Sequence, residues 1–271
     1  MIESPKNERI RHYRRLRKKN FRYREGKFLV EGFQCVGEAL TSGFVPECLI
    51  CNEKGSVAIE AYADIIRERS IAHYIATDEV ISSLTATVTP QGVIAVVPML
   101  HRDLEGLLED EPHTLLVANK VRDPGNLGNM IRIADAAGAG GMLVCAQSVD
   151  PYNPKTVRST AGSLFHIPMS VGEEVSETIA GLKRKGYAVY AADAHNGTCI
   201  WEMEWPQKLA LVMGNEAWGL GTEAGLLADE LVRVEVFGKA ESLNVAAATA
   251  VILYEVRRRR SEGGYSIDGR R

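Results

Sequence analysis

Long apolar runs are missing from this sequence. Although 45% of its 271 residues are hydrophobic, no apolar run approaches the roughly 20 residues that a membrane-spanning helix needs. The N-terminus is basic but is not followed by the apolar core of a signal peptide. The composition is otherwise that of an ordinary globular protein, and its length is enough for one large or two smaller domains. We therefore expect no membrane partner and a cytoplasmic location.

Cysteine is scarce and does not form a metal-binding pattern. The sequence has five cysteines, at positions 35, 48, 51, 145 and 199. Cys48 and Cys51 form a lone CxxC without the second Cys or His pair that a zinc site needs, and the six histidines show no ligand spacing. The sequence predicts buried, reduced thiols and no metal.

Charge is unevenly distributed along the chain. The net charge is only −3, but residues 1–27 contain eleven Lys and Arg against three acidic residues. Residues 256–271 contain six Arg against two acidic residues, so the middle of the chain is strongly acidic. A basic segment on an acidic body is typical of proteins that bind a polyanion. A solvated basic helix is the alternative.

Aromatic residues alternate with cations in the basic N-terminal segment. Phe21 and Tyr23 are suited to stack on unpaired bases while their neighbours contact phosphates. This combination favours RNA as the partner. The candidate RNA-binding residues are Arg14, Arg15, Arg17, Lys18, Lys19, Phe21, Arg22, Tyr23 and Arg24.

The chain contains two successive alternations of strands and helices. The first predicts a small α/β domain within residues 1–98, with strands at 27–31, 45–51, 72–76 and 93–97 and helices at 33–41 and 56–68. Residues 98–113 are rich in acids and leucine and contain two prolines, which indicates a linker with one helical turn at 99–113. The second alternation, at 114–260, has nearly continuous apolar strands, which indicate a parallel sheet covered on both faces. Its strands are predicted at 114–118, 141–145, 187–192, 209–213 and 231–236, with a final helix at 245–260 and a basic tail at 261–271.

A turn and a helix follow the strand at 114–118. Asp123-Pro124-Gly125 is a turn sequence, Asn126 is suited to cap the helix, and Gly138 to end it. Apolar residues recur at helical spacing as Leu127, Ile131 and Ala134. Arg132 shares this helix with an Asn-rich N-terminus, which indicates a site. An ordinary crossover helix with a solvated arginine is the other interpretation at this point.

Two further polar segments follow predicted strands of the second domain. Gly214-Asn215-Glu216 follows the strand at 209–213, and the carboxyl ends of strands are where open α/β sheets bind ligands. Ser242 and Asn244 precede the last helix and are helix-capping residue types. For each segment alone, a purely local role in turns and caps is the simpler interpretation. Neither matches GxGxxG or the P-loop pattern.

Together and in order, these segments resemble a known family. Asp123-Pro-Gly-Asn-Leu-Gly with Arg132, Gly214-Asn-Glu with Gly219, and Ser242-Leu-Asn-Val resemble the three motifs of the SpoU (TrmH-type) branch of the SPOUT RNA methyltransferases. Asp150-Pro-Tyr-Asn-Pro-Lys with Arg158 and Gly162 resembles the family's segment between the first two motifs. Residues 1–98 resemble the ribosomal-protein-like substrate-binding domain that precedes many such enzymes.

The resemblance implies a fold, a reaction and a set of residues. It implies an α/β fold whose parallel-sheet domain contains a trefoil knot, a homodimer, and methylation of a ribose 2′-hydroxyl in structured RNA by S-adenosylmethionine. The matching positions deviate at Glu235 and Trp218, where relatives commonly carry other residues. The implied cofactor-binding residues are Met213, Gly214, Val234, Val236 and Leu243. The implied catalytic residues are Arg132, Asn126, Glu216, Ser242 and Asn244.

Several functional alternatives remain open from the sequence. A guanidinium is almost never deprotonated, so Arg132 is expected to position the hydroxyl or a phosphate, with general-base duty left open. The appended domain favours 23S ribosomal RNA, including the antibiotic-resistance type of enzyme, over transfer RNA. A non-catalytic RNA-binding module would not need Asn126, Arg132 and Asn244 together. A nucleotide-dependent oxidoreductase would need a phosphate-binding loop, which is missing.

Overall fold

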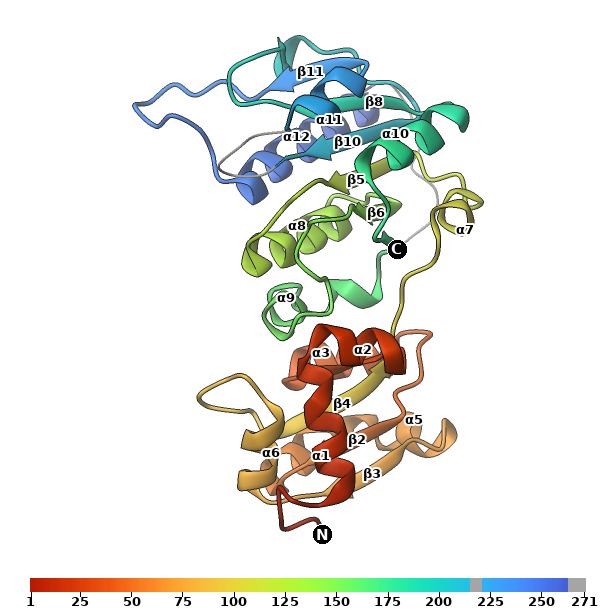
Figure 1. Ribbon diagram of the computed structural model, residues 1–271, viewed down its shortest axis with the longest axis vertical. Coiled ribbons are helices and arrows are strands. Elements are labelled where there is room, and N and C mark those ends of the chain that lie inside the picture. Colours follow the sequence, from red (N-terminus) through yellow and green to blue (C-terminus); the bar gives the residue numbers. More distant parts are fainter. Residues whose placement is uncertain (215–220, 263–271) are drawn as a thin grey trace. The chain divides into compact units, whose positions relative to one another are not determined.

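The computed structural model describes residues 1–214 and 221–262 of the chain, which is divided into two compact units (Figure 1). The N-terminal unit comprises Met1–Leu100 together with Asp150–His166, and the C-terminal unit comprises His101–Val149 together with Ile167–Arg271. We call Asp150–His166 the strap, because the chain leaves the C-terminal unit to form it and then returns. The domain boundaries predicted from the sequence, 1–98 and 114–260, are contiguous and do not include such an excursion of the chain. They stay predictions.

The N-terminal unit is built on a four-stranded mixed sheet. Its strands are β1 Lys27–Glu31, β2 Cys48–Cys51, β3 Ala72–Ile75 and β4 Val93–Pro98. They lie in the order β1-β4-β2-β3, with β4 antiparallel to both its neighbours and β2 parallel to β3. The strand predicted at 45–51 is shorter than expected, because Pro46 has no N–H to donate to a ladder.

Helices of the N-terminal unit cover this sheet. The prediction of one continuous helix at 56–68 is wrong. Asn52 caps a helix that starts earlier than predicted, and that helix ends where the chain turns at the buried Ile59. Two short helices and a 3-10 turn replace the predicted helix. The α-helices are α1 Glu8–Arg14, α2 Lys19–Glu25, α3 Phe33–Thr41, α4 Glu53–Ala58, α5 Ala63–Glu68, α6 Asp78–Leu84 and α9 Pro154–Ser159, and the 3-10 turns are η1 Arg15–Arg17, η2 Glu60–Tyr62 and η3 Ser163–Phe165.

The basic N-terminal segment is a folded part of this unit. Ile10, Tyr13 and Leu16 of α1 and η1 are buried and belong to the same apolar cluster as Ile50 of β2. Asn7 caps α1 by accepting hydrogen bonds from the backbone of Arg9 and Ile10. The segment therefore presents one apolar side to the sheet and leaves most of its cations on the outside.

The C-terminal unit contains a seven-stranded sheet. Every paired neighbour in it is parallel, which confirms the predicted parallel sheet. β7 and β9 were not predicted, because two or three residues carry too little pattern. The strands are β5 Thr114–Ala118, β6 Gly141–Val144, β7 Met169–Val171, β8 Ala188–Ala192, β9 Thr198–Cys199, β10 Leu209–Met213 and β11 Glu230–Arg233, in the order β7-β6-β5-β10-β8-β11-β9.

Helices lie on both faces of the parallel sheet (Figure 1). Alternate strand residues, such as Val117 and Val212, form one apolar cluster with residues of α7 Leu104–Leu108, α10 Val175–Arg184 and α11 Gly221–Leu227. Helices α8 Pro124–Ala136 and α12 Val245–Glu262 pack against each other. A 3-10 turn, η4 Ile200–Glu202, follows β9. Most of the predicted linker belongs to this unit, since Leu107 and Leu108 of α7 are in its core.

Strand β11 is shorter than the strand predicted at 231–236. It ends at Arg233, because its neighbours pair no further: β8 reaches only Val232 and β9 only Arg233. Val234 and Val236 therefore lie beyond the sheet ladder. This shortening bears on the site, because the backbone of these residues is no longer committed to a strand.

The cysteines agree with the expectation of buried thiols. All five cysteines are buried and free, and burial raises the pKa of the Cys51 thiol to about 12 and that of Cys145 to about 11. The thiols of Cys51 and Cys145 are therefore neutral and unreactive at physiological pH. Within residues 1–214 and 221–262, no helix is both long and apolar enough to cross a membrane.

Candidate functional site

The first two motifs meet at the carboxyl edge of the C-terminal sheet. Strands β5 and β10 are parallel neighbours, with Ala118 opposite Met213 at their ends. The backbone N–H of Asn119 donates to the carbonyl of Met213 at 2.9 Å. The loop of the first motif and the Gly214 segment thus begin side by side, as expected for a ligand site of an open α/β sheet.

Helix α8 begins one turn earlier than predicted. Asp123, not Asn126, is its N-cap, and its Oδ1 accepts a hydrogen bond from the backbone N–H of Asn126 at 2.9 Å. Pro124 occupies the first helical turn, where its missing N–H does no harm. The predicted cap at Asn126 is therefore wrong, although the Asp-Pro pair could have indicated the correct one. Leu127, Ile131 and Ala134 are fully buried, which confirms the predicted apolar face.

Asn244 connects the third motif to the first. Its Nδ2 donates to Oδ1 of Asn126 at 3.0 Å. Its own Oδ1 accepts from the backbone N–H groups of Ala246 and Ala247, which caps α12. The amide of Asn244 thus both caps α12 and bonds to the first motif. From the sequence, a local capping role and a role in a site were alternatives. Since β11 is separated from β10 by β8, residues 234–244 carry the chain from β11 back to the beginning of α8.

Arg132 lies on the outside of α8, about one and two-thirds turns after Asn126. Its side chain is exposed, and no carboxylate of the described part of the chain forms an ion pair with it. Ser242 is also exposed, just before the cap of α12. Arg132 and Ser242 are therefore accessible to a ligand. Glu216 and Trp218 lie outside the described residues.

The candidate cofactor-binding residues combine apolar side chains with uncommitted backbone. Met213 and Gly214 are buried at the end of β10, Val234 and Val236 are half-buried beyond β11, and Leu243 is 39% exposed. An adenine ring needs apolar walls with a few backbone hydrogen bonds. These residues fit S-adenosylmethionine in that respect, because apolar side chains and non-ladder backbone occur together at one edge of the sheet.

Phe21 is not available to stack on bases. It is only 6% exposed, and the guanidinium carbons of Arg15 and Arg24 lie 4.1 and 4.5 Å from the centroid of its ring. The predicted stacking on RNA is contradicted by this burial, because the ring is covered by the protein's own cations. Phe21 instead orients two of the basic side chains.

Arg22 is also an interior residue, at 2% exposure. Its Nε and Nη2 donate to Oδ2 of Asp150, and its Nη1 donates to the carbonyls of Leu16 and Arg17 at 2.9 Å each. A direct phosphate contact by Arg22 is therefore contradicted. Asp150 was recognised only as part of a family segment, and its contact with Arg22 was missed, because the two residues lie 128 positions apart and no local pattern connects them.

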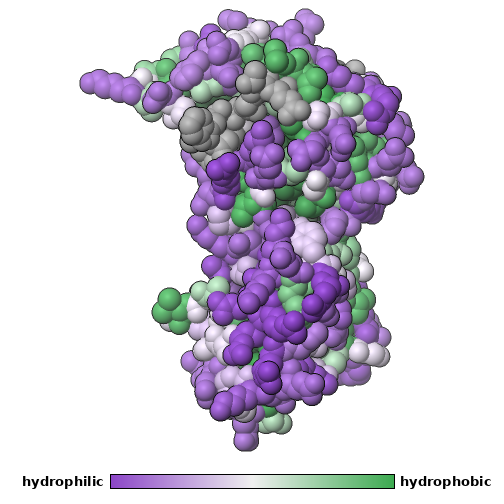
Figure 2. Space-filling view, viewed as in Figure 1, coloured by the Kyte–Doolittle hydropathy of each residue, from purple (hydrophilic) through white to green (hydrophobic). Residues whose placement is uncertain are grey.

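The remaining cations form an exposed surface on η1, α2 and the end of α1. Figure 2 shows that the face bearing α1 and α2 is largely hydrophilic. Tyr23 is 37% exposed, with Nζ of Lys19 5.6 Å from its ring centroid, so it stays a candidate for base contact. We call the exposed cations the basic surface: Arg14, Arg15, Arg17, Lys18, Lys19 and Arg24.

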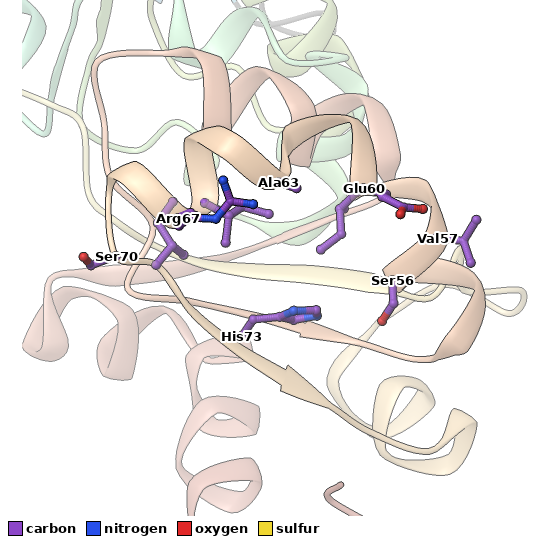
Figure 3. Close-up of a pocket in the computed structure, with 10 residues that line it drawn as sticks. Ser56, Val57, Glu60, Ala63, Arg67, Ser70 and His73 are labelled. Atoms are coloured by element: carbon purple, nitrogen blue, oxygen red, sulfur yellow. The ribbon is translucent and has the colours of Figure 1, made fainter.

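A separate hollow of about 700 Å³ lies in the N-terminal unit between β3 and the α4–η2–α5 segment (Figure 3). Ile59, Ile66 and Ile71 are among its lining residues. His73 also lines it, and burial lowers the pKa of this imidazole, so the ring is neutral at physiological pH. None of the predicted catalytic, cofactor-binding or RNA-binding residues lines this hollow.

Comparison with known families assigns both parts of the chain. The model of the SpoU rRNA Methylase family matches residues 113–254, which is more than half of the chain. The chain belongs to this family. The model of the MRM3-like substrate binding domain matches residues 7–95. The second match agrees with the resemblance of the N-terminal segment to a substrate-binding domain.

The chain is similar over nearly its whole length to named methyltransferases and to solved structures. The chain is 38% identical over 259 residues, covering 94% of it and 98% of the relative, to the 23S rRNA (guanosine(2553)-2′-O)-methyltransferase RlmP of Bacillus subtilis. It is 32% identical over 251 residues, covering 90% and 87%, to the 23S rRNA (uridine(2479)-2′-O)-methyltransferase of Streptomyces viridochromogenes. An AdoMet-bound rRNA methyltransferase from Sinorhizobium meliloti superimposes with a TM-score of 0.85 at 32% identity, covering 95% and 97%.

A pair of substitutions separates the two functions of Asn244 in this family member. Asn244→Ala should destabilise the protein by about 1 kcal/mol, because it removes the α12 cap, and should also remove the bond to Asn126. Asn126→Ala also removes that bond but keeps the cap, so it should cost less stability than Asn244→Ala. Thermal unfolding of both variants tests this. Equal losses of stability would show that the bond to Asn126, rather than the cap, is what matters.

Proposed function

We propose that this protein transfers a methyl group from S-adenosylmethionine to a ribose 2′-hydroxyl in 23S ribosomal RNA. The observation that carries the proposal is the Asn126–Asn244 bond, which connects the first and third SpoU motifs, while the loop of the first motif begins next to the end of β10, where the second motif starts. Two relatives that match nearly the whole chain are named as 23S rRNA 2′-O-methyltransferases. Solved relatives with bound AdoMet support the choice of methyl donor.

The methyl donor supplies an electrophilic methyl group on a sulfonium centre. Gly214 and the backbone around Val234 and Val236 would hold its polar groups, with Met213 and Leu243 as apolar walls. Because adenine recognition of this kind depends on the main chain, single changes of the side chains at these positions should weaken binding only modestly.

Arg132 would position the reacting hydroxyl or the adjacent phosphate. Its planar guanidinium donates in a fixed fork that suits phosphate oxygens. Asn126 and Asn244, bonded to each other, would fix the N-terminal end of α8 relative to that of α12. Ser242 would add a hydroxyl beside them. Glu216 stays a proposed catalytic residue on the motif resemblance alone.

The basic surface would bind the ribosomal RNA substrate through phosphates, with Tyr23 adding contact to a base. We also propose that the protein works as a homodimer and that its C-terminal unit contains the trefoil knot implied by the family. For a chain of 29.7 kDa, sedimentation velocity should give about twice this mass at working concentration. A fully active monomer would contradict the dimer.

The modified nucleotide does not follow from the relatives, because their names specify different ones, a guanosine and a uridine. Transfer of radiolabelled methyl groups to 23S, 16S and transfer RNA from cells without the protein tests the proposal. We expect label only in 23S RNA, at one 2′-O-methylated position found by mapping. Label in transfer RNA instead would favour the alternative substrate, and no label with bound S-adenosylmethionine would remove the activity.

A further inference from the structure

The strap is continuous in sequence with the methyltransferase sheet but packs as part of the unit that carries the basic surface. We propose that it couples RNA docking on α1 and α2 to methyl transfer, with Arg22 and Asp150 as positioning residues. This inference rests on the proposed function, since it concerns how that reaction is controlled. Three sets of contacts within the N-terminal unit support it.

The first set ties the strap to the middle of the basic surface. Arg22 lies on α2, between the exposed Lys19 and Arg24, yet its guanidinium turns inward onto Asp150. Tyr23 Oη donates to the other carboxylate oxygen of Asp150 at 3.2 Å, and so does the backbone N–H of Tyr152 at 3.0 Å. The cost of burying this ion pair is reduced because the second carboxylate oxygen of Asp150 and Nη1 of Arg22 are also hydrogen-bonded. Such a pair can fix how the strap is aligned on α2.

The second set seats the beginning of the strap on β1. Tyr152 is fully buried, and its ring centroid is 4.7 Å from that of Phe28. Its hydroxyl oxygen accepts a hydrogen bond from the backbone N–H of Leu100 at 3.0 Å. Phe165, at the other end of the strap, stacks with Phe28 at a centroid distance of 6.4 Å. Both ends of the strap thus contact Phe28 in the four-stranded sheet of the N-terminal unit.

The third set connects the strap to the end of β1 and to α3. Arg158 forms an ion pair with Glu31, and His166 lies 3.1 Å from Glu38. Gly162 has a φ of +103°, and a Cβ there would lie 2.3 Å from Cγ of Glu38. Only glycine fits this approach, because a side chain would clash and the backbone conformation is left-handed. The strap is therefore held along its length.

The coupling follows from covalent continuity. The residues before the strap lead from β6 and those after it lead into β7, two neighbouring strands of the methyltransferase sheet. A shift of α2 when RNA binds must move Asp150, and this movement reaches the connection between β6 and β7 through the chain itself. A flexible linker at Leu100 alone would not transmit it.

Hydrogen exchange provides a test that does not depend on activity. RNA binding should slow amide exchange in residues 150–166 of the wild-type protein, and Asp150→Asn should abolish this slowing. Arg158→Gln, at a partly exposed ion pair, serves as a second variant in case Asp150→Asn does not fold. Arg102→Gln is the matched control, because it also removes an ion pair, with Asp110, but on the surface of the C-terminal unit.

Kinetics distinguishes coupling from damage. At saturating RNA, Asp150→Asn and Arg158→Gln should lower kcat by about tenfold, within the usual range for coupling between sites. Their affinities for RNA and for S-adenosylmethionine should change less than about twofold. Unchanged kcat, a parallel loss of cofactor affinity, or strap exchange indifferent to RNA would each overturn the inference. An inactive wild-type protein would remove the proposed function, while the exchange experiment would still decide the coupling.

Discussion

Replacing Arg132 by alanine is expected to reduce methyl transfer by at least a hundredfold while leaving S-adenosylmethionine affinity unchanged. The expected size is that of losing one charged or hydrogen-bonding group that acts in the transition state, about 10²–10³-fold. Arg132 is exposed on α8, whereas Met213, one of the proposed cofactor-binding residues, is buried. Single-turnover rates with saturating RNA, together with calorimetry of the cofactor, measure the two effects separately.

The conservative variant adds information about the role of Arg132. Arg132→Lys keeps the charge but loses the planar fork, so it should restore little activity if the guanidinium holds two oxygens at once. Arg184→Ala is the control, because Arg184 is an exposed arginine on α10 of the same unit. Wild-type rates for Arg132→Ala would exclude this residue from the mechanism, and a loss of cofactor affinity would mean that it supports the binding pocket instead.

The sequence predicted those features that depend on neighbouring residues. Buried parallel strands are nearly continuous runs of apolar residues, which is why 114–118 and 209–213 were predicted with correct ends. The apolar face of α8 follows from helical spacing in the same way. The ordered motifs predicted where the site lies, because the first two polar segments follow parallel strands, and parallel strands share one carboxyl edge.

The errors in prediction arise where distant residues decide the structure. The burial of Phe21 and Arg22 could not be predicted, because an interleaved basic and aromatic segment has the same local pattern whether it contacts RNA or its own domain. Asp150, which accepts the hydrogen bonds of Arg22, is distant in sequence and lies in a segment that resembles a methyltransferase motif. Likewise, the end of β11 is determined by where its neighbours stop pairing, not by the apolar residues at 234 and 236.

These corrections sharpen the prediction for RNA binding, which now concerns the basic surface alone. The triple variant Arg14→Gln, Arg17→Gln, Lys18→Gln removes three exposed cations that make no ion pair within the described residues. If each contacts one phosphate of a single strand, the slope of log affinity against log salt should become shallower by about 2, at roughly 0.7 per contact. Affinity should fall most at low salt.

A control with equal charge makes the result specific. The variant Lys54→Gln, Arg67→Gln, Arg102→Gln also removes three exposed cations, but from other parts of the surface. It should keep the wild-type salt slope, because long-range attraction between exposed charges is largely screened beyond about 10 Å at 0.1 M salt. Fluorescence anisotropy with a 23S RNA fragment at several salt concentrations measures both slopes. Equal slopes for the two triple variants would mean that α1, η1 and α2 serve only to complete the N-terminal unit, and that RNA binds elsewhere.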